Sequence, residues 1–236
     1  QLLTLSPALG FAAPTGATEV KLKRQGTLHF LPISVDGQKP VEAALDLGNG
    51  GALSLSKEYH ESVPALAKLP YAISLSGGVG GLHETKRVTM PTVEIGGYTF
   101  KNVPTDFGSV ADGPYEGRAN AGIQLFRPFQ VTLDLGHDRL WLKPSGGVPV
   151  FNKDRAGMFL MLEGDHLNVL HVTPGSPAEK AGLKKGDKLV EIGGEPVGPG
   201  FYTSKRAGWA REAIGTKVGI TKSDGQTVTL ILADYF

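Results

Sequence analysis

The sequence contains no cysteine, which excludes disulfide bonds, thiol nucleophiles and cysteine metal ligands. No apolar run approaches the length that spans a membrane. The formal net charge is only +1, with no dense block of lysine or arginine, so we expect no nucleic-acid partner. The six histidines show no HExxH or comparable spacing, and we therefore expect no metal site.

Glycine and proline are abundant instead, with 33 and 16 residues and no fixed period. This composition predicts many turns and hence many short strands. A chain of 236 residues with 40% hydrophobic residues can bury one large core or two modest ones. We therefore expect a mainly β protein of one or two domains.

The pattern of apolar, polar and turn-forming residues changes three times along the chain. Residues 1–18 are small, apolar and interrupted by prolines, which is typical of a tail or a linker from an upstream segment. Because the chain begins with glutamine rather than methionine, we expect that a signal peptide or a larger segment preceded it. Residues 19–143 alternate between apolar and polar and predict an all-β domain with short helices, one near residues 57–62. Residues 144–154 are turn-rich and predict a linker.

Residues 155–236 have a different pattern, which predicts a small α+β domain. Ser176 can cap a short helix, Pro177 suits its first position, Glu179 completes a capping box and Gly182 suits its end. Strands are predicted on both sides of this helix, and the chain closes with a hairpin.

The quadruplet "LDLG" occurs twice, at residues 45–48 and 133–136. The second copy lies in an alternating hairpin that places Asp134 on the polar face. In the first copy Asp46 ends a mostly apolar strand and is followed by glycines. A buried carboxylate is costly unless it is hydrogen-bonded or near another ionisable group, and glycines let backbone amides approach it. This placement favours a functional carboxylate, although Asp46 could also simply cap its turn.

A strand ending in Asp-x-Gly, the following "GALSLS", a glycine-rich hairpin and the closing "AGIQLFRPFQVTLDLGHDRLWLKP" together resemble one half of a retropepsin-like aspartic peptidase. The similarity covers about residues 19–143. It implies an acid-protease β-barrel half in which Asp46 is the catalytic position. Leu47 then stands at the threonine position and Gly48 at the glycine position of the active-site loop, which Asn49 completes.

The same resemblance assigns two glycine features. Gly122 corresponds to the glycine before the closing helix of the family. Residues 76–84 correspond to the flap that would cover a bound peptide, and its glycine-rich tip is Gly77, Gly78, Val79, Gly80 and Gly81.

The chemistry of that family requires two carboxylates that share one proton. This chain offers one, so the resemblance implies a homodimer or an upstream second half, and the linker-like first residues favour the upstream half. Two departures matter: Leu47 lacks the hydroxyl that bonds across the family's symmetry axis, and Asn49 replaces a small residue, although its amide could donate to Asp46. Two functions therefore remain open. The chain is an aspartic endopeptidase with a water nucleophile and no cofactor, or a catalytically degenerate half that acts as a peptide-binding adaptor or scaffold.

The run "VTPGSPAEKAGLKKGDKLVEIGGEPV" resembles PDZ domains of the circularly permuted bacterial kind, over about residues 155–234. Such domains add an extended peptide, usually a C-terminal tail, to the edge of a sheet. The resemblance implies that the amides of Gly157, Met158 and Phe159 hold the terminal carboxylate and that Leu160 begins the pairing strand.

The opposite wall of the peptide site is expected on a helix over residues 202–214. At helical spacing, Tyr202, Lys205, Trp209 and Ala213 share one side of it. The alternative is that these residues only form the domain core.

Two remaining points concern cofactors and location. The "LGNGGAL" turn lacks the third glycine of the dinucleotide-binding spacing and is followed by a strand, so we expect no organic cofactor. Bacterial PDZ modules of this kind are commonly exported, and the resemblance therefore implies the periplasm or cell envelope.

Overall fold

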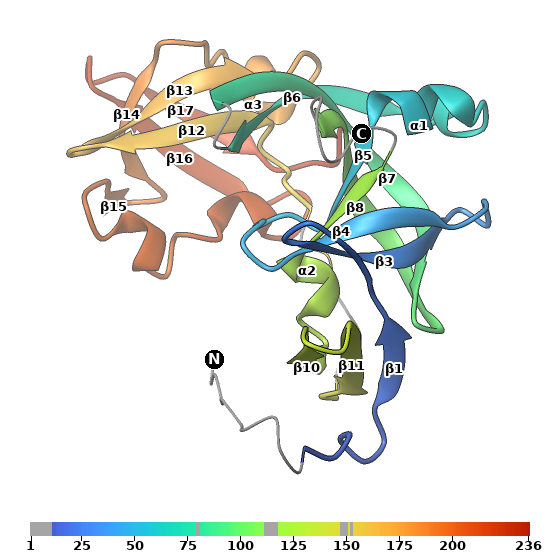
Figure 1. Ribbon diagram of the computed structural model, residues 1–236. Coiled ribbons are helices and arrows are strands. Elements are labelled where there is room, and N and C mark those ends of the chain that lie inside the picture. The colour runs from blue at the N-terminus through green and yellow to red at the C-terminus, as the bar shows by residue number, and fades with distance from the viewer. Residues whose placement is uncertain (1–10, 79–80, 111–117, 147–150, 152) are drawn as a thin grey trace.

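A computed structural model describes residues 11–78, 81–110, 118–146, 151 and 153–236 (Figure 1). Most of its regular structure is strand, and the strands form three sheets, so the expected mainly β class is confirmed. In the described part of the chain, no helix is both long enough and apolar enough to cross a membrane.

The strands are β1 (Thr18–Lys21), β2 (Lys23–Gln25), β3 (Leu28–Val35), β4 (Val41–Asp46), β5 (Leu53–Ser56), β6 (Tyr71–Gly78), β7 (Gly81–Ile95), β8 (Tyr98–Val110), β9 (Ala119–Gly122), β10 (Phe129–Asp134), β11 (Arg139–Pro144), β12 (Met158–Glu163), β13 (His166–Val172), β14 (Lys188–Ile192), β15 (Glu195–Pro196), β16 (Lys217–Lys222) and β17 (Thr227–Ile231). The helices are α1 (Lys57–Ser62), α2 (Ile123–Phe126) and α3 (Pro177–Lys180), and the 3-10 turns are η1 (Leu66–Lys68), η2 (Phe201–Thr203) and η3 (Trp209–Arg211).

The largest sheet has the order β2-β3-β4-β9-β5-β8-β7-β6, and β3 also pairs with β7. This extra pairing closes the strands from β3 to β7 into a barrel-like ring. Two pairs inside the ring, β4 with β9 and β5 with β8, are parallel, whereas β5 and β9 are antiparallel. Strand β6 stays at the edge of the sheet.

A hydrophobic core fills this ring. Each fully buried leucine, isoleucine or phenylalanine stabilises the fold by about 1.5–3 kcal/mol. Its buried members include Leu31, Ile33, Leu53, Leu55, Met90, Phe100, Leu125, Phe126, Leu140 and Leu142.

The small sheet β1-β11-β10 contains the second LDLG copy. Asp134 ends β10 opposite Arg139 of β11, and its carboxylate accepts a hydrogen bond from Nδ1 of His137 at 2.8 Å. The quadruplet is thus the end of a strand and the turn that follows, as the alternating pattern predicts.

The third sheet, β12-β13-β14-β16-β17 with β15 on β14, surrounds a second core. The predicted capped helix is present as α3: the Ser176 hydroxyl accepts a hydrogen bond from the Glu179 amide, and Pro177 occupies the first turn. The Glu179 carboxylate bonds to the amide of Gly175, one residue before the cap.

The helix predicted over residues 202–214 is wrong, because the structure has only η2 and η3 in this segment. Ser204 ends η2 in an extended conformation, and its hydroxyl accepts the amide hydrogen of Arg206. Such local bonds from serine compete with helix formation, and Gly208 before η3 disfavours a helix further.

The regions around the two cores contact each other. Strand β6 lies beside β12 and β13 (Figure 1). In the segment predicted to be a linker, Phe151 packs on the ring of Phe100, and the partly buried Asp154 accepts a hydrogen bond from the Tyr235 hydroxyl at 3.1 Å. Phe151 and Asp154, at least, are therefore part of the packed structure.

Burial raises the pKa of the Asp154 carboxyl above its ordinary value, and the Gly157 amide, the Arg87 charge and the Tyr235 hydroxyl offset that increase only in part. A carboxyl whose pKa is raised by folding stabilises the fold while protonated, and this contribution is lost as the pH rises through the raised pKa.

We expect Asp154→Asn to become more stable relative to the wild type as the pH is raised from about 4 to 7, because asparagine keeps the acceptor oxygen without the buried charge. The difference in the free energy of unfolding should grow by at most about 1.4 kcal/mol per pH unit. Denaturant unfolding followed by tryptophan fluorescence at several pH values measures this difference. Asp165→Asn is the control, because a hydrogen bond from His166 lowers the pKa of the exposed Asp165 carboxyl, so that it titrates below this pH range and the difference from the wild type should stay nearly constant. A constant difference between D154N and wild type would contradict the expectation.

Candidate functional site

Asp46 stands at the end of an interior strand. Strand β4 lies between β3 and β9, and its residues Val41, Ala43 and Ala44 are buried. Parallel pairing with β9 places Asp46 directly opposite Gly122. The apolar strand thus delivers a carboxylate to the point where two neighbouring strands end together.

Backbone hydrogen bonds hold the loop after Asp46 against the start of α2. The Asn49 carbonyl accepts the Ile123 amide hydrogen at 2.9 Å, and the Gly51 carbonyl accepts that of Gln124 at 3.1 Å. A Cβ atom at Gly122 would lie only 2.4 Å from the Gly51 carbonyl oxygen. Only glycine allows this approach, which gives a physical reason for the glycine singled out by the resemblance.

Three hydrogen bonds hold the Asp46 carboxylate. Its Oδ1 accepts from the amides of Gly48 at 3.0 Å and Asn49 at 3.1 Å, and its Oδ2 accepts from the Nδ2 of Asn120 at 2.9 Å. Both oxygens are therefore fixed in direction. The turn-cap interpretation and the functional interpretation of Asp46 both agree with the two backbone bonds, but the third bond comes from another strand.

A chain of two side-chain amides supports this arrangement. The Nδ2 of Asn49 donates to the Oδ1 of Asn120 at 2.8 Å, and the Oδ1 of Asn49 accepts the Gly51 amide hydrogen at 2.8 Å. Asn49 thus reaches Asp46 through its backbone amide and through Asn120, rather than through its own side-chain amide. Sequence reasoning missed Asn120, whose only signal is its place two residues before Gly122 on the strand parallel to β4.

Leu47, the residue after Asp46, is 37% exposed. Among the residues that the structure describes, no second carboxylate is hydrogen-bonded or ion-paired to Asp46. The chain therefore presents one fixed carboxylate beside an exposed apolar side chain. No group of three or more histidine, aspartate or glutamate side chains within the described ranges could hold a metal ion.

The predicted flap is the end of the β6–β7 hairpin. Gly77 pairs with Leu82, and Gly78 pairs with Gly81. Val79 and Gly80, which were predicted at the tip, lie outside the described residues. The described glycines thus belong to two long antiparallel strands.

The second candidate site is the free edge of β12, which is an edge strand of its sheet. Leu160 lies opposite Val169, whose amide and carbonyl bond to the 186–187 turn on the other side. By the alternation of antiparallel pairs, the backbone groups of Leu160 point to the free edge. The Tyr202 hydroxyl approaches the Leu160 carbonyl there at 3.5 Å.

The loop before β12 is already hydrogen-bonded inside the chain. The Gly157 amide donates to Asp154 at 2.7 Å, and the Gly157 carbonyl accepts the Thr173 amide hydrogen at 2.9 Å. Met158 and Phe159 pair with Val172 and His171 of β13. Of the three amides expected to receive a terminal carboxylate, that of Gly157 therefore has an internal carboxylate as its partner.

The two aromatic residues of the predicted wall have different environments. Tyr202 is 53% exposed beside β12, and its partial burial raises its pKa above the ordinary tyrosine value. Trp209 is only 3% exposed and packs in the second core. The core alternative considered from the sequence thus describes Trp209, whereas Tyr202 lies next to the free edge.

We expect Asn120→Asp to lower the free energy of unfolding by about 1–3 kcal/mol near pH 7, because it replaces a donor to Asp46 with a like charge. At about pH 4.5 the loss should shrink, since two adjacent carboxyls can share a proton. The matched control is Asn168→Asp, because Asn168 donates to Glu163 on an exposed hairpin where water screens the charges. Equal losses in both variants at both pH values would contradict the special role of Asn120.

Comparisons with known proteins found similarities in structure and in sequence. Two solved structures are similar: a retropepsin-like aspartic protease from Rickettsia conorii, with 23% identity, a TM-score of 0.40 and coverage of 54% of this chain and 89% of that chain, and the HtrA-type protease AlgW with decapeptide, with 14% identity, a TM-score of 0.33 and coverage of 69% and 59%.

In sequence, 49 residues are 39% identical to the "Putative serine protease HhoA" of Synechocystis sp. (strain ATCC 27184 / PCC 6803 / Kazusa). This stretch is 21% of the present chain and only 12% of HhoA. Residues 169–204, from within β13 to the start of the segment after η2, match the PDZ domain family. The chain therefore carries a PDZ domain match beside a mainly β barrel.

Proposed function

We propose that the chain is a peptidase-related protein with two modules: an N-terminal module, residues 19–143, that supplies half of an aspartic endopeptidase site, and a C-terminal module, residues 155–236, that binds extended peptides. One core lies in each module. The PDZ domain match at residues 169–204 supports the assignment of the second module.

The observation that carries the peptidase assignment is the geometry of Asp46. Its carboxylate stands at the end of β4, with both oxygens oriented by three donors and with the loop clamped on α2. An acid peptidase needs such a fixed carboxylate, which shares a proton with a second one and activates a water. The second carboxylate has to come from another copy of the chain or from another half of the protein.

We expect Asp46→Asn to reduce peptide hydrolysis at acid pH by at least about 100-fold, because it removes the general base. A mixed peptide digest followed by mass spectrometry, with and without a transition-state-mimicking inhibitor of aspartic proteases, measures this activity. The matched control is Asp134→Asn, which alters the other LDLG copy and should leave turnover unchanged. Inhibitor-resistant cleavage that survives in D46N would refute the assignment.

The second candidate function is a peptide-binding scaffold whose peptidase half is inactive. Two observations favour it. The Asp46 oxygen that the backbone amides leave open, Oδ2, accepts a hydrogen bond from Asn120, whose amide cannot share a proton as a second carboxyl would. Leu47 has no hydroxyl. In this case the wild type shows no inhibitor-sensitive product in the same digest while peptide binding to the C-terminal module persists.

Peptide binding is assigned to the free edge of β12. Leu160 turns its backbone amide and carbonyl outward there, and the Tyr202 hydroxyl approaches that carbonyl. An added strand would satisfy these groups, as in β-strand addition to other sheets. The expected location in the cell envelope belongs to this proposal and rests on the resemblance to exported PDZ modules.

The peptide for this test is selected on the immobilised full chain from a displayed random heptapeptide library. We expect Tyr202→Ala to weaken the binding of this peptide by about three- to tenfold, because the Tyr202 ring lies at the edge where the peptide strand would be added. Fluorescence anisotropy of the labelled peptide measures the affinity. The control is Ile231→Ala, since Ile231 is 51% exposed on β17 at the opposite edge of the same sheet. If no peptide is enriched, or both variants bind like the wild type, the β12 edge is not the binding site.

A further inference from the structure

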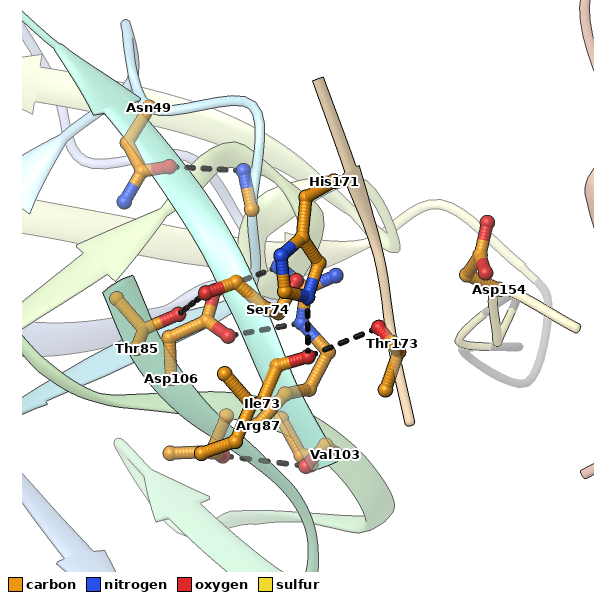
Figure 2. Close-up of polar contacts among 12 residues, drawn as sticks. Asn49, Ile73, Ser74, Thr85, Arg87, Val103, Asp106, Asp154, His171 and Thr173 are labelled. Atoms are coloured by element: carbon orange, nitrogen blue, oxygen red, sulfur yellow. Dashed lines mark hydrogen bonds and ion pairs between the residues drawn. The ribbon is translucent and has the colours of Figure 1, made fainter. Parts of the chain in front are cut away.

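The edge strand of the N-terminal barrel is held by side chains of the C-terminal module. The Ile73 carbonyl on β6 accepts two hydrogen bonds, one from the Thr173 hydroxyl at 2.8 Å and one from Nε2 of His171 at 3.1 Å (Figure 2). A carbonyl can only accept, so Nε2 of His171 carries the proton in this bond. Both donors stand on or just after β13.

These donors are directly connected to β12, the strand proposed to receive the peptide. Thr173 is 2% exposed, and its backbone amide donates to the Gly157 carbonyl immediately before β12 at 2.9 Å. His171 pairs with Phe159 in β12. The strand that would receive the peptide and the strand that holds Ile73 therefore form one antiparallel pair.

On the barrel side, β6 is tied to the rest of its hairpin. Beside Ile73, Ala72 pairs with Arg87 of β7, and the Arg87 guanidinium donates two hydrogen bonds to Asp106 of β8 at 2.8 and 2.9 Å (Figure 2). Burial alone would lower the pKa of Arg87, but the charge of Asp106 raises it above the ordinary arginine value. The ion pair thus links β7 to β8, and Ile73 belongs to a set of three connected strands.

We infer that the C-terminal module positions the β6–β7 hairpin, and that an extended peptide added to β12 steadies this hairpin through Thr173 and His171. The inference rests on the proposed peptide binding at β12. Pairing of a peptide with β12 restricts the motion of the β12–β13 pair, and the Ile73 contacts pass that restriction to β6. Coupling through reduced motion needs no change in the mean structure, and it is reciprocal.

The first test requires no ligand. Thr173→Val removes the hydroxyl with little change of shape, and we expect amide hydrogen exchange in β6 and β7 of the full chain to become about fivefold faster, the value of one hydrogen bond. Thr173→Ser restores a hydroxyl and should return exchange to within about twofold of the wild type. Amides of β16 and β17 report whether the C-terminal module remains folded.

A second variant guards against a general loss of stability. His171→Phe removes the other donor to Ile73 and should give the same local acceleration. The loss of one hydrogen bond should change the exchange rate by more than about twofold. If the exchange rates of the hairpin amides in both T173V and H171F stay within about twofold of the wild type, the positioning role is overturned. The positioning role is also overturned if, in both variants, the amides of β16 and β17 exchange faster by the same factor as those of the hairpin.

The second test uses the selected heptapeptide at saturation. We expect it to slow exchange in β6 and β7 of the wild type and to lose at least half of this effect in T173V. Unchanged hairpin exchange in a wild type that binds the peptide overturns the coupling but leaves peptide binding at β12 intact. Failure to select any peptide overturns the proposed binding function and this coupling with it, whereas the first test still decides whether the module positions the hairpin.

Discussion

The arrangement of the Asp46 site depends on one close approach, that of Gly122 to the loop that follows β4. The carbonyls of Asn49 and Gly51 lie so near the Gly122 backbone that no side chain could fit between them. This contact brings the start of α2 against the loop and lets its amides satisfy the loop carbonyls. Without it, the loop would have to satisfy these groups with water, and the direction of the carboxylate would no longer be determined.

The surroundings of Asp46 are built from amides. Two backbone amides and the side chain of Asn120 satisfy the carboxylate, and Asn49 completes the network from the other side. Such a network orients a charge well, but it contains no second acid. The same geometry is therefore compatible with a half-site that is completed by a partner and with a half-site that has been converted to a support, and the difference lies in what faces the exposed Leu47.

The junction between the two modules contains charged and hydrogen-bonding groups as well as the Phe100–Phe151 ring pair. Arg87 and Asp106 neutralise each other inside the barrel sheet, and Asp154 is held by backbone amides and by Tyr235. Partly buried charges are tolerated only when their partners are in place, so such a junction favours one relative placement of the strands around it. This specificity suits a contact that transmits the state of one strand, β12, to another, β6.

Local signals in the sequence were sufficient for the hairpin around Asp134, for α3 and for the strand that ends at Asp46. The alternation around Asp134 predicted a hairpin, and the Ser176-Pro177-Glu179 pattern predicted α3, because these features depend on neighbours within a few residues. The apolar strand ending in Asp46 also predicted where the candidate carboxylate lies. The helix over residues 202–214 failed because a serine side chain and a glycine interrupted a favourable spacing.

By itself, then, the sequence determined the strands, the capped helix and the position of Asp46 at the end of a buried strand, since period and capping act locally. Only the tertiary structure decided that Asn120 bonds to Asp46 across 74 residues of sequence and that Thr173 bonds to Ile73 across 100. It also decided that Trp209 belongs to the core. These contacts depend on which strands become neighbours, and strand pairing is set by the packing of the whole core rather than by any short stretch of the chain.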